Sequence, residues 1–396
     1  MKRVSHYLIK YILGVSACLL ASCHHDHHKP DPQIAERTVI VYMMAENSLS
    51  SFSKSDINEM VAASGVIPED VNYIIYKDAA INSSDKSEAL PVIYRLSAKK
   101  GLQTWYSFHD DHDSCDSLTM LSTLRRIIDA FPARHYGLVF WSHASGWIPR
   151  RKTLGVDNGK NSTNSNAGSE MEITALRWTL DQIPHTDYIF FDACFMQDIE
   201  VAYELREVTD WIVGSSAEIP APGAPYDLLM PSLCQGDAVG ITETYHGYYP
   251  STVWSYEVVL SAIRTDRLDA LAEATHRFIP SLYSGRADVS QYRFQRYCSD
   301  YSNFTYCFDM AKTMHCLLSA EEYEEWYQAF EEAVPCHPLT QSWYANRCLD
   351  PRVIDPEHCG SVSMYVPSSY DATVGWNDAL HKMQWYRAAG WDLTGW

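Results

Sequence analysis

Three short runs of the chain are almost entirely apolar, and they constrain the fold more than any other feature of the sequence. They cover residues 38–44 (TVIVYMM), 136–141 (YGLVFW) and 188–191 (YIFF). Such runs are typical of strands buried on both faces, as in a parallel sheet covered by helices. Residues 117–131, in contrast, repeat apolar side chains at three- and four-residue steps, which predicts a helix. We therefore predict an α/β fold with a mostly parallel central sheet.

The rest of the chain extends this alternation and indicates two parts. Further strands are predicted at residues 71–76, 91–96, 211–214 and 361–366. Further helices are predicted at residues 54–63, 171–182, 197–207, 258–278, 311–333 and 376–389. Strands alternate with helices up to about residue 245, whereas the remainder is mainly helical. We predict a sheet-containing domain at residues 37–245 and a helical C-terminal subdomain, residues 246–396, packed on it.

The N-terminus carries signals for export. Basic residues precede an apolar run at residues 11–21, which is shorter than a membrane span and typical of a secretory signal peptide. The run ends in Leu-Ala-Ser-Cys at residues 20–23, which resembles the lipobox of bacterial lipoproteins. That resemblance implies cleavage after a signal peptide of residues 1–22, and lipidation of Cys23 with enough acyl chains for stable attachment. An ordinary signal peptide with an incidental cysteine is the alternative.

A polar segment follows at residues 23–36, rich in histidine and proline. We predict a hydrated tether between the lipid and the domain, and a metal-binding tract is the alternative for its histidines. The chain is therefore expected to be an exported bacterial lipoprotein, held by its N-terminal lipid at the periplasmic or cell-surface side of a membrane.

Charge and cysteine spacing exclude several classes of function. The formal net charge of −19 argues against binding to nucleic acid or anionic lipid. The 11 cysteines include no CxxC pair, so no zinc ribbon or thioredoxin-like site is indicated, and any disulfide pairing is left open. We predict no metal site and no cofactor required for the chemistry, although calcium is compatible with the sequence. The oligomeric state is not indicated.

Two residues of reactive type come directly after buried strands. His143 follows the strand at residues 136–141, and Cys194 follows the strand at 188–191. Because the carboxyl ends of parallel strands meet at one edge of a sheet, where sites gather, we expect these side chains to lie close together. An imidazole can activate a thiol and later protonate the leaving amine. We also predict that Cys194 begins the next helix, whose N-terminus would favour the thiolate.

The residues around this pair resemble the clostripain family of cysteine peptidases. Residues 142–147 (SHASGW) look like the histidine motif of that family, and residues 191–194 (FDAC) look like its cysteine motif. The resemblance continues through residues 157–159 (DNG), 171–173 (MEI), 214–218 (GSSAE) and 385–391 (WYRAAGW). It extends from about residue 38 to the end of the chain. The two motifs together are fairly specific, whereas either alone would not be.

This resemblance implies a caspase-like α/β/α sandwich and an endopeptidase that cleaves protein or peptide substrates after Arg or Lys. It also implies catalysis by His143 and Cys194, oxyanion binding by the amides of Ala144 and Cys194, and a substrate-binding role for Asp192 in the specificity pocket. The chain departs from the family at Ala144, where glycine is usual. Because a Cβ makes positive φ costly, we expect this alanine to reduce activity or alter substrate approach.

The segment at residues 150–170 lies between the two motifs and is rich in Asn, Ser and Gly. We predict a mobile surface loop there. Some members of the family cleave themselves in the corresponding loop, so Lys152 and Lys160 are candidate processing sites. Solvated lysines without such a role are the alternative.

Each of these assignments has a simpler alternative. Cys194 could be a small buried apolar residue, and His143 a hydrogen-bonded core residue. Asp192 could only cap the following helix, in which case Glu218 and Asp227 are the next candidates for specificity. At the level of the whole protein, a catalytically silent caspase-like lipoprotein used for binding or assembly is the main alternative, because a fold does not guarantee its chemistry. An amidase acting on small molecules is another.

Overall fold

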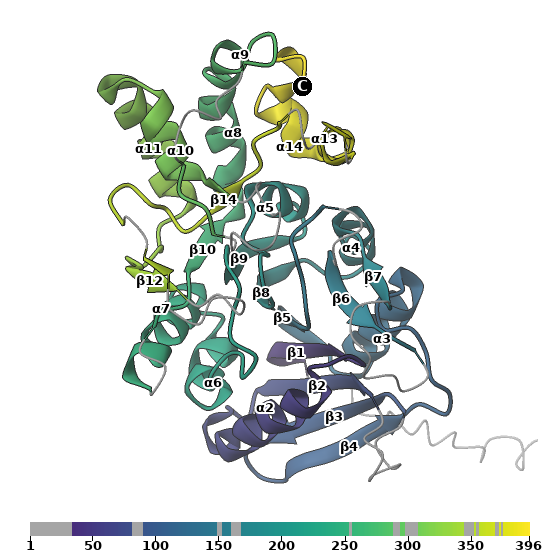
Figure 1. The fold of residues 1–396 in the computed structure, drawn as a ribbon. Helices are drawn as coiled ribbons and strands as arrows, with labels where there is room; N and C mark the ends of the chain where they lie inside the picture. Colours follow the sequence, from purple (N-terminus) through teal and green to yellow (C-terminus); the bar gives the residue numbers. More distant parts are fainter. Residues whose placement is uncertain are drawn as a thin grey trace, which may run out of the picture. The chain divides into compact units, whose positions relative to one another are not determined.

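An eight-stranded sheet lies at the centre of the structure, a computed structural model (Figure 1). Its strands, in spatial order, are β10 (Leu260–Arg264), β9 (Thr209–Ser215), β8 (Thr186–Asp192), β5 (Ala133–Trp141), β1 (Ala35–Ala45), β2 (Val71–Ala79), β3 (Val92–Ser97) and β4 (Gly101–Ser107). The described residues are 34–80, 90–148, 153–159, 168–252, 256–287, 294–297, 308–343, 352–353, 356–368, 372–373 and 375–396. Residues 35–396 form one compact unit.

The middle of the sheet is parallel and its edges are antiparallel. Strands β2, β1, β5, β8 and β9 pair parallel with one another, whereas the pairs β2–β3, β3–β4 and β9–β10 are antiparallel. Side chains alternate between the two faces, as in every strand: Tyr42 and Met44 of β1 pack on one face, and Val41 and Met43 pack on the other. All four are fully buried, which is why this run is continuously apolar.

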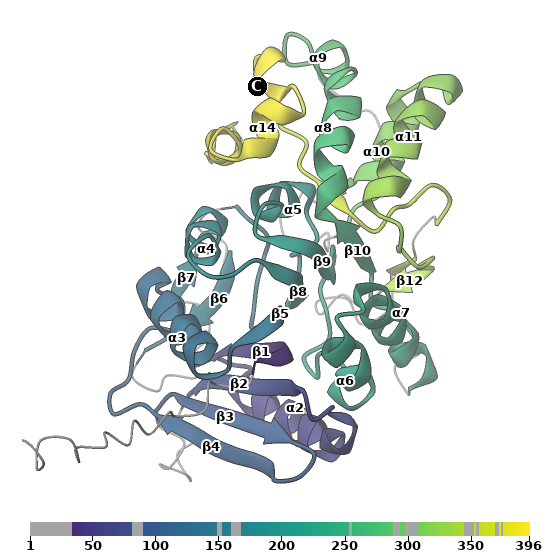
Figure 2. The same cartoon turned by 180° about the vertical axis from the view of Figure 1, so that it is seen from behind.

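Helices cover both faces of the sheet (Figures 1 and 2). One face packs against α3 (Ser117–Ala130), α4 (Ile173–Leu180) and α5 (Ile199–Leu205). The other packs against α2 (Ser50–Ala62), α6 (Tyr226–Gln235) and α7 (Ala238–Tyr248). The predicted α/β fold with a mostly parallel central sheet is confirmed.

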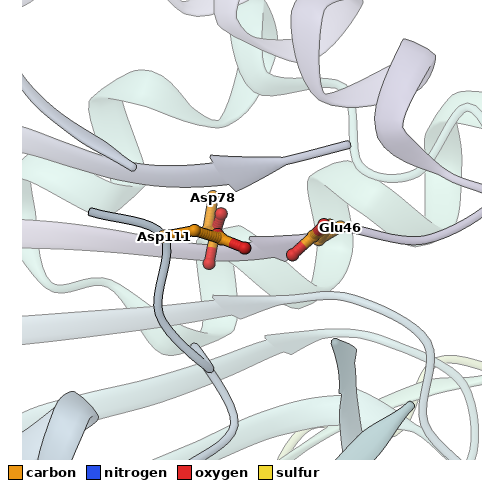
Figure 3. Close-up of side chains that lie close together, drawn as sticks. All are labelled: Glu46, Asp78 and Asp111. Atoms are coloured by element: carbon orange, nitrogen blue, oxygen red, sulfur yellow. The ribbon is translucent and has the colours of Figure 1, made fainter. Parts of the chain in front are cut away.

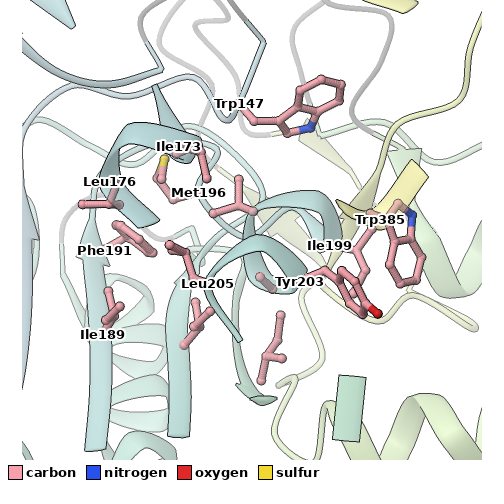
Figure 4. Close-up of a cluster of buried hydrophobic side chains, with 14 of the residues drawn as sticks. Trp147, Ile173, Leu176, Ile189, Phe191, Met196, Ile199, Tyr203, Leu205 and Trp385 are labelled. Atoms are coloured by element: carbon pink, nitrogen blue, oxygen red, sulfur yellow. The ribbon is translucent and has the colours of Figure 1, made fainter. Parts of the chain in front are cut away.

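The apolar cluster on the α5 face joins the sheet to the C-terminal part of the chain (Figure 4). Its labelled members are Trp147, Ile173, Leu176, Ile189, Phe191, Met196, Ile199, Tyr203, Leu205 and Trp385. Tyr203 of α5 packs edge-on against Trp385, with ring centroids 5.4 Å apart, and Trp385 is fully buried. Burial of aromatic side chains of this size is worth several kcal/mol, so it holds the C-terminal segment against α5.

The C-terminal part differs from the prediction at several points. Residues 258–278 are not one helix: β10 adds to the edge of the sheet beside β9, and only then does α8 (Leu268–His276) begin. The reason is that residues 258–263 form a buried apolar run, and a short run of this kind fits a strand or a helix equally well. The predicted boundary at residue 245 therefore assigned β10, an edge strand of the central sheet, to the C-terminal subdomain.

Two other predicted helices are each divided. Residues 311–333 form α10 (Met310–Leu317) and α11 (Ala320–Ala333), because Ser319 caps the second helix in a capping box with Glu322. Residues 376–389 form α13 (Trp376–Leu380) and α14 (Gln384–Ala388). The remaining elements are η1 (Ser64–Val66), η3 (Tyr249–Ser251), η4 (Thr265–Arg267), α9 (Ile279–Leu282), β11 (Phe308–Asp309), β12 (Ser342–Trp343), β13 (Arg352–Val353), β14 (Ser363–Met364) and η5 (Trp391–Leu393).

The segment predicted as a mobile loop contains a β-hairpin. Strands β6 (Leu154–Asp157) and β7 (Ser169–Met171) pair antiparallel, and every residue of β6 is buried. The prediction was wrong here because Leu154 and Val156 are too few to give a periodic pattern. Both are nevertheless fully buried, and Leu154 belongs to the apolar cluster on the α5 face of the sheet.

Candidate active site

Strand register brings His143 and Cys194 to the same edge of the sheet. In the parallel pair β5–β8, Trp141 lies opposite Asp192. His143 and Cys194 each come two residues later, so both leave the sheet at its carboxyl edge, from adjacent strands. Both side chains are partly exposed, which a residue that meets a substrate requires. The arrangement suits an imidazole acting on a neighbouring thiol.

The loop that carries His143 is held from two directions. The hydroxyl of Ser48, just beyond the end of β1, lies 2.8 Å from Nε2 of His143. On the other side, the main chain joins β6: the amide of Gly155 donates to the carbonyl of His143 (3.0 Å) and the amide of Ser145 donates to that of Thr153 (3.2 Å). The imidazole is therefore oriented by its ring and by its backbone. Sequence reasoning missed Ser48, because its proximity arises only from the order of strands β1 and β5.

Cys194 does not begin a helix, contrary to the prediction. Helix α5 begins at Ile199, and the intervening residues form a tight turn in which Phe195 has a positive φ of 57°. The turn forms because the amide of Gln197 donates to the carbonyl of Ser215, the last residue of β9, and the amide of Phe195 donates to the carbonyl of Ala217 just beyond it, both at 3.1 Å. A left-handed non-glycine residue costs about 1–2 kcal/mol, and such residues gather at functional sites.

A backbone amide, rather than a helix N-terminus, supports the sulfur. The amide of Ile219 lies 3.3 Å from Sγ of Cys194, which is within donor range for sulfur. A donor in this position stabilises a thiolate more than a thiol, because hydrogen bonds to charged acceptors are stronger. Residue 219 follows the GSSAE segment, so this contact was not visible in the sequence.

Ala144 fits its position without backbone strain. Among the described residues, the non-glycine residues with positive φ are Phe195, Arg286, His358 and Ser361, so Ala144 is not one of them. The left-handed residue of this loop is Gly146, with φ of 83°, where a Cβ would lie 2.4 Å from Asp198 Oδ2. The expected conformational penalty for alanine at position 144 therefore does not arise, and its amide remains a candidate oxyanion donor.

Asp192 is a buried carboxylate with unused hydrogen-bonding capacity. The side chain is 3% exposed, and Oδ2 accepts from the hydroxyl of Tyr226 (2.9 Å) and the amide of Ala224 (3.3 Å). Within the described part of the chain, Oδ1 accepts no hydrogen bond. Burial raises the pKa of Asp192 to about 6. Asp192 does not cap α5, the helix that follows it. The N-cap of that helix is Asp198, and the hydrogen bonds of Asp192 go to Ala224 and Tyr226 near the start of α6.

Two further acids accompany Asp192, and both come from α2. Asp56 is 1% exposed and accepts from the indole of Trp141 (2.6 Å), and Glu59 accepts from the amide of Tyr226 (3.2 Å). Burial raises the pKa of Asp56 to about 9, with the charge of Asp192 adding to the shift, and burial also raises the pKa of Glu59. At neutral pH the three acids Asp192, Asp56 and Glu59 are therefore not all ionised. A cationic side chain placed beside them would be favoured, because it would stabilise their ionised forms.

The other residues named from the sequence lie elsewhere or are not described. Asp227 is exposed in the first turn of α6, and Glu218 is partly exposed after β9. Asp56 and Glu59 were missed, although an acid on the buried face of a predicted helix is a signal that could have found Asp56. Lys152, Lys160 and Cys23 lie outside the described residues.

Comparison with protein families gives a match over most of the chain. The model of the clostripain family, Peptidase_C11, matches residues 41–396. A search of curated proteins found no match. Among the described residues, no helix is both long enough and apolar enough to cross a membrane.

Solved structures give the same family relationship. One is a secreted C11 cysteine protease from Bacteroides thetaiotaomicron in complex with an irreversible peptide inhibitor. It is 28% identical, with a TM-score of 0.75, and the match covers 90% of this chain and 100% of that one. Another is an inactive zymogen C11 protease from Parabacteroides distasonis, 26% identical with a TM-score of 0.74, where the match covers 90% of this chain and 99% of that one.

Proposed function

The chain belongs to the clostripain family of cysteine peptidases, and from that premise we propose that it cleaves proteins or peptides after Arg or Lys, with His143 and Cys194 as its catalytic pair. The observation that carries the proposal is the strand register. Trp141 and Asp192 are opposite one another in β5 and β8, and the two reactive side chains follow at equal distances along the chain. A thiol and an imidazole of unrelated function would have no reason to share that position.

The chemistry follows from the contacts of the two residues. The thiolate of Cys194, supported by the Ile219 amide, attacks the scissile carbonyl carbon and forms a tetrahedral oxyanion. The amides of Ala144 and Cys194 donate to that oxyanion. His143 then protonates the leaving amine, and an acyl-enzyme forms. Water, deprotonated by the same imidazole, releases the acid and restores the thiol.

Asp192 is the proposed determinant of specificity. A carboxylate that is nearly fully buried has lost its hydration, and a substrate guanidinium or ammonium restores a favourable partner. The Oδ1 atom, which accepts no hydrogen bond from the described residues, offers the acceptor site that such a group needs. A cationic side chain in the pocket would also favour ionisation of the companion acids Asp56 and Glu59, whose pKa values are raised by burial in its absence.

Export and lipid attachment are proposed from the sequence of the N-terminus. The basic start, the apolar run and the Leu-Ala-Ser-Cys ending support cleavage before Cys23 and lipidation of its thiol. A structural relative is described as secreted, which agrees with export. That description says nothing about how such a protein is attached to a membrane.

Processing within residues 150–170 is proposed on the position of that segment. Strands β6 and β7 attach its two ends to the edge of the sheet beside the catalytic pair, so a chain cut at Lys152 or Lys160 would stay assembled. A relative from Parabacteroides distasonis is described as an inactive zymogen, which supports activation by cleavage.

Matched peptide substrates test the proposed function. We expect hydrolysis of peptides with Arg or Lys before the scissile bond, much slower hydrolysis of the same peptides with norleucine there, and none by Cys194→Ala or His143→Ala protein. Cys316→Ala, which removes an exposed cysteine, is the control and should retain activity. Full turnover by Cys194→Ala would remove the catalytic proposal, and binding without turnover by the wild type would favour a silent binding protein.

A further inference from the structure

Two buried acids at the start of α5 support the loop at residues 143–148, which we call the histidine loop. At Gly146 the main chain of this loop lies directly against Asp198, because a Cβ added to that glycine would be 2.4 Å from Oδ2 of Asp198. The next residue, Trp147, is buried, and its indole lies beside Glu200. The two acids therefore meet the loop that carries the proposed base.

Strand β14 and the residue that follows it contact the same two acids. The hydroxyl of Ser363 donates to Oδ1 of Asp198, and the two residues also form a parallel β-bridge. Two residues further along each segment, the amide of Tyr365 donates to Oε1 of Glu200 (3.0 Å). Tyr365 in turn packs edge-on against Trp147, with ring centroids 5.4 Å apart. The acid pair thus lies where the histidine loop, α5 and the C-terminal part of the chain meet.

Neither acid is fully used by the hydrogen bonds of the fold. Asp198 is 3% exposed and stands at the N-cap of α5, yet its side chain caps none of the amides of that helix. Glu200 is fully buried, and its Oε2 atom accepts no hydrogen bond from the described residues. If Glu200 were ionised, this oxygen would carry charge without water and without a donor in the described part of the chain, which is costly.

Burial and mutual repulsion keep a proton on the pair. Burial raises the pKa of Asp198, and burial together with the charge of Asp198 raises the pKa of Glu200. Two neighbouring carboxyl groups in such a site do not both ionise at neutral pH, because each negative charge disfavours the other. The pair therefore carries fewer than two charges where most exposed acids are fully ionised.

No basic side chain among the described residues faces the pair from the elements packed around it. The histidine loop presents Gly146 and Trp147, and the C-terminal part presents Ser363 and Tyr365, whose hydroxyl donates to an asparagine. On α5 itself the next acid is Glu204, which accepts from the first amide of α14 and has the same sign of charge. A second ionisation of the pair would therefore need water, which can enter if the histidine loop separates from α5.

Another group of acids, beside the ends of β1 and β2, is open to solvent. It consists of Glu46, Asp78 and Asp111, whose carboxylates lie close together (Figure 3), and Asp111 is exposed. Solvent can stabilise charge at that exposed member without any movement of the chain. Asp198 and Glu200 are both buried, so a second charge on this pair requires a change in structure.

We propose that Asp198 and Glu200 are positioning residues for His143: while they share a proton they hold the histidine loop against α5, and loss of that proton releases the loop. Gly146, which lies against Asp198, is three residues from His143, so release moves the imidazole away from Cys194. Activity thus acquires an alkaline limit that does not come from the catalytic pair itself. The inference rests on the proposed peptidase function for its kinetic test, but not for its structural test.

Hydrogen exchange tests the release of the loop without any need for catalysis. Full-chain Cys194→Ala protein, which cannot cleave itself, is compared at pH 7 and pH 9, and the exchange of peptides covering residues 143–148 is corrected for the intrinsic rate. We expect opening of the loop to increase by about tenfold at pH 9, because one proton is lost in this range. Glu200→Gln in the same background cannot ionise, so its opening should change by less than about twofold.

The kinetic test uses chains with an intact Cys194 and a lysyl peptide substrate between pH 6 and pH 9. The ratio of kcat/KM for the wild type to that for Glu200→Gln is taken at each pH, so titration of the catalytic pair cancels. This ratio should fall by about tenfold between pH 7 and pH 9. Glu204→Gln is the matched control, because it removes a buried carboxylate from the same helix. It should follow the wild-type pH profile and the parent exchange.

The outcomes separate this inference from the proposed function. Loop opening that does not increase at pH 9 in the parent, or that increases equally in Glu200→Gln, would overturn the inference. A ratio of wild type to Glu200→Gln that stays constant with pH would also overturn it, because it would assign Glu200 a purely structural role. If the wild type hydrolyses no peptide, the proposed function fails, and the exchange measurement alone decides whether the acid pair holds the loop.

Discussion

Substitution of Asp192 by asparagine is the most informative test of specificity. The change keeps the size of the side chain and leaves an oxygen that can accept from Tyr226 and Ala224, so the pocket should retain its shape. What it removes is the negative charge. Losing one partner of a desolvated charge pair costs about 2–5 kcal/mol, which corresponds to a decrease of about 30- to 4,000-fold in kcat/KM for Arg and Lys substrates. Norleucine substrates should lose far less.

The pKa of Asp192 adds a pH dependence with a definite sign. Burial raises this pKa to about 6, so the carboxyl group of the free enzyme is about 90% ionised at pH 7 and about 10% ionised at pH 5. Only the ionised form attracts a cationic side chain. The preference for basic over norleucine substrates should therefore fall about tenfold from pH 7 to pH 5 in the wild type. It should not change with pH in Asp192→Asn.

The assay measures kcat/KM for matched Lys and norleucine peptides between pH 5 and pH 8, which reports the ionisation of the free enzyme. The ratio of kcat/KM for the Lys peptide to that for the norleucine peptide is taken at each pH. Titration of the catalytic pair affects both values equally, so it cancels in this ratio. Asp227→Asn removes an exposed carboxylate from α6 and is the control. An unchanged basic-to-norleucine ratio in Asp192→Asn would refute the reasoning. Equal losses for both substrates with lower thermal stability would instead assign Asp192 a structural role.

Three further predictions address the remaining parts of the site and the chain. Ser48→Ala should lower kcat by about two- to tenfold with little change in KM, because the hydroxyl positions His143 without touching substrate; an unchanged kcat in steady-state assays would contradict this. Cys23→Ser should appear in the soluble fraction or as unprocessed precursor, and fractionation identical to the wild type would reject lipidation. Active enzyme should separate into two associated fragments on denaturing gels, and a Lys152→Ala, Lys160→Ala double variant should stay intact; cleavage of that variant at other bonds would place processing elsewhere.

The strands that position the site were predictable because each of them forms a short, continuous apolar run in the sequence. Strands β1, β5 and β8 are buried on both faces, so each is a continuous apolar run. Since their carboxyl ends share one edge, the positions of His143 and Cys194 followed as well. The family motifs carried the assignment further, to Asp192.

What could not be predicted depends on contacts between distant segments. Strand β10 was taken for part of a helix, because a short buried run does not distinguish the two structures. Asp56 lies beside Asp192 only because α2 and α6 pack on the same face of the sheet. The turn after Cys194 depends on hydrogen bonds to Ser215 at the end of β9 and to Ala217 just beyond it, which replace the expected first turn of a helix.

Leu118 illustrates a smaller error of the same kind. It belongs to the apolar pattern of α3, yet it is 64% exposed. Asp116 is the N-cap of this helix and accepts from the amides of Leu118 and Thr119, at 3.0 and 2.9 Å. Met120, in the same first turn, is fully buried, so this turn does reach the apolar surface, and Leu118 lies instead to one side of the buried face. The three-residue step from Leu118 to Leu121 therefore does not place both side chains on that face.

The central claim is that Cys194 is the nucleophile of an enzyme that accepts basic side chains, and covalent labelling tests it most directly. The purified chain is treated with a peptidyl-lysyl chloromethyl ketone, digested, and examined by mass spectrometry for the modified residue. We predict one adduct, on Cys194, which is lost in Cys194→Ala and does not form with the norleucine analogue at the same concentration. An adduct on another cysteine, or unimpaired peptide hydrolysis by protein whose Cys194 is fully modified, would contradict the account.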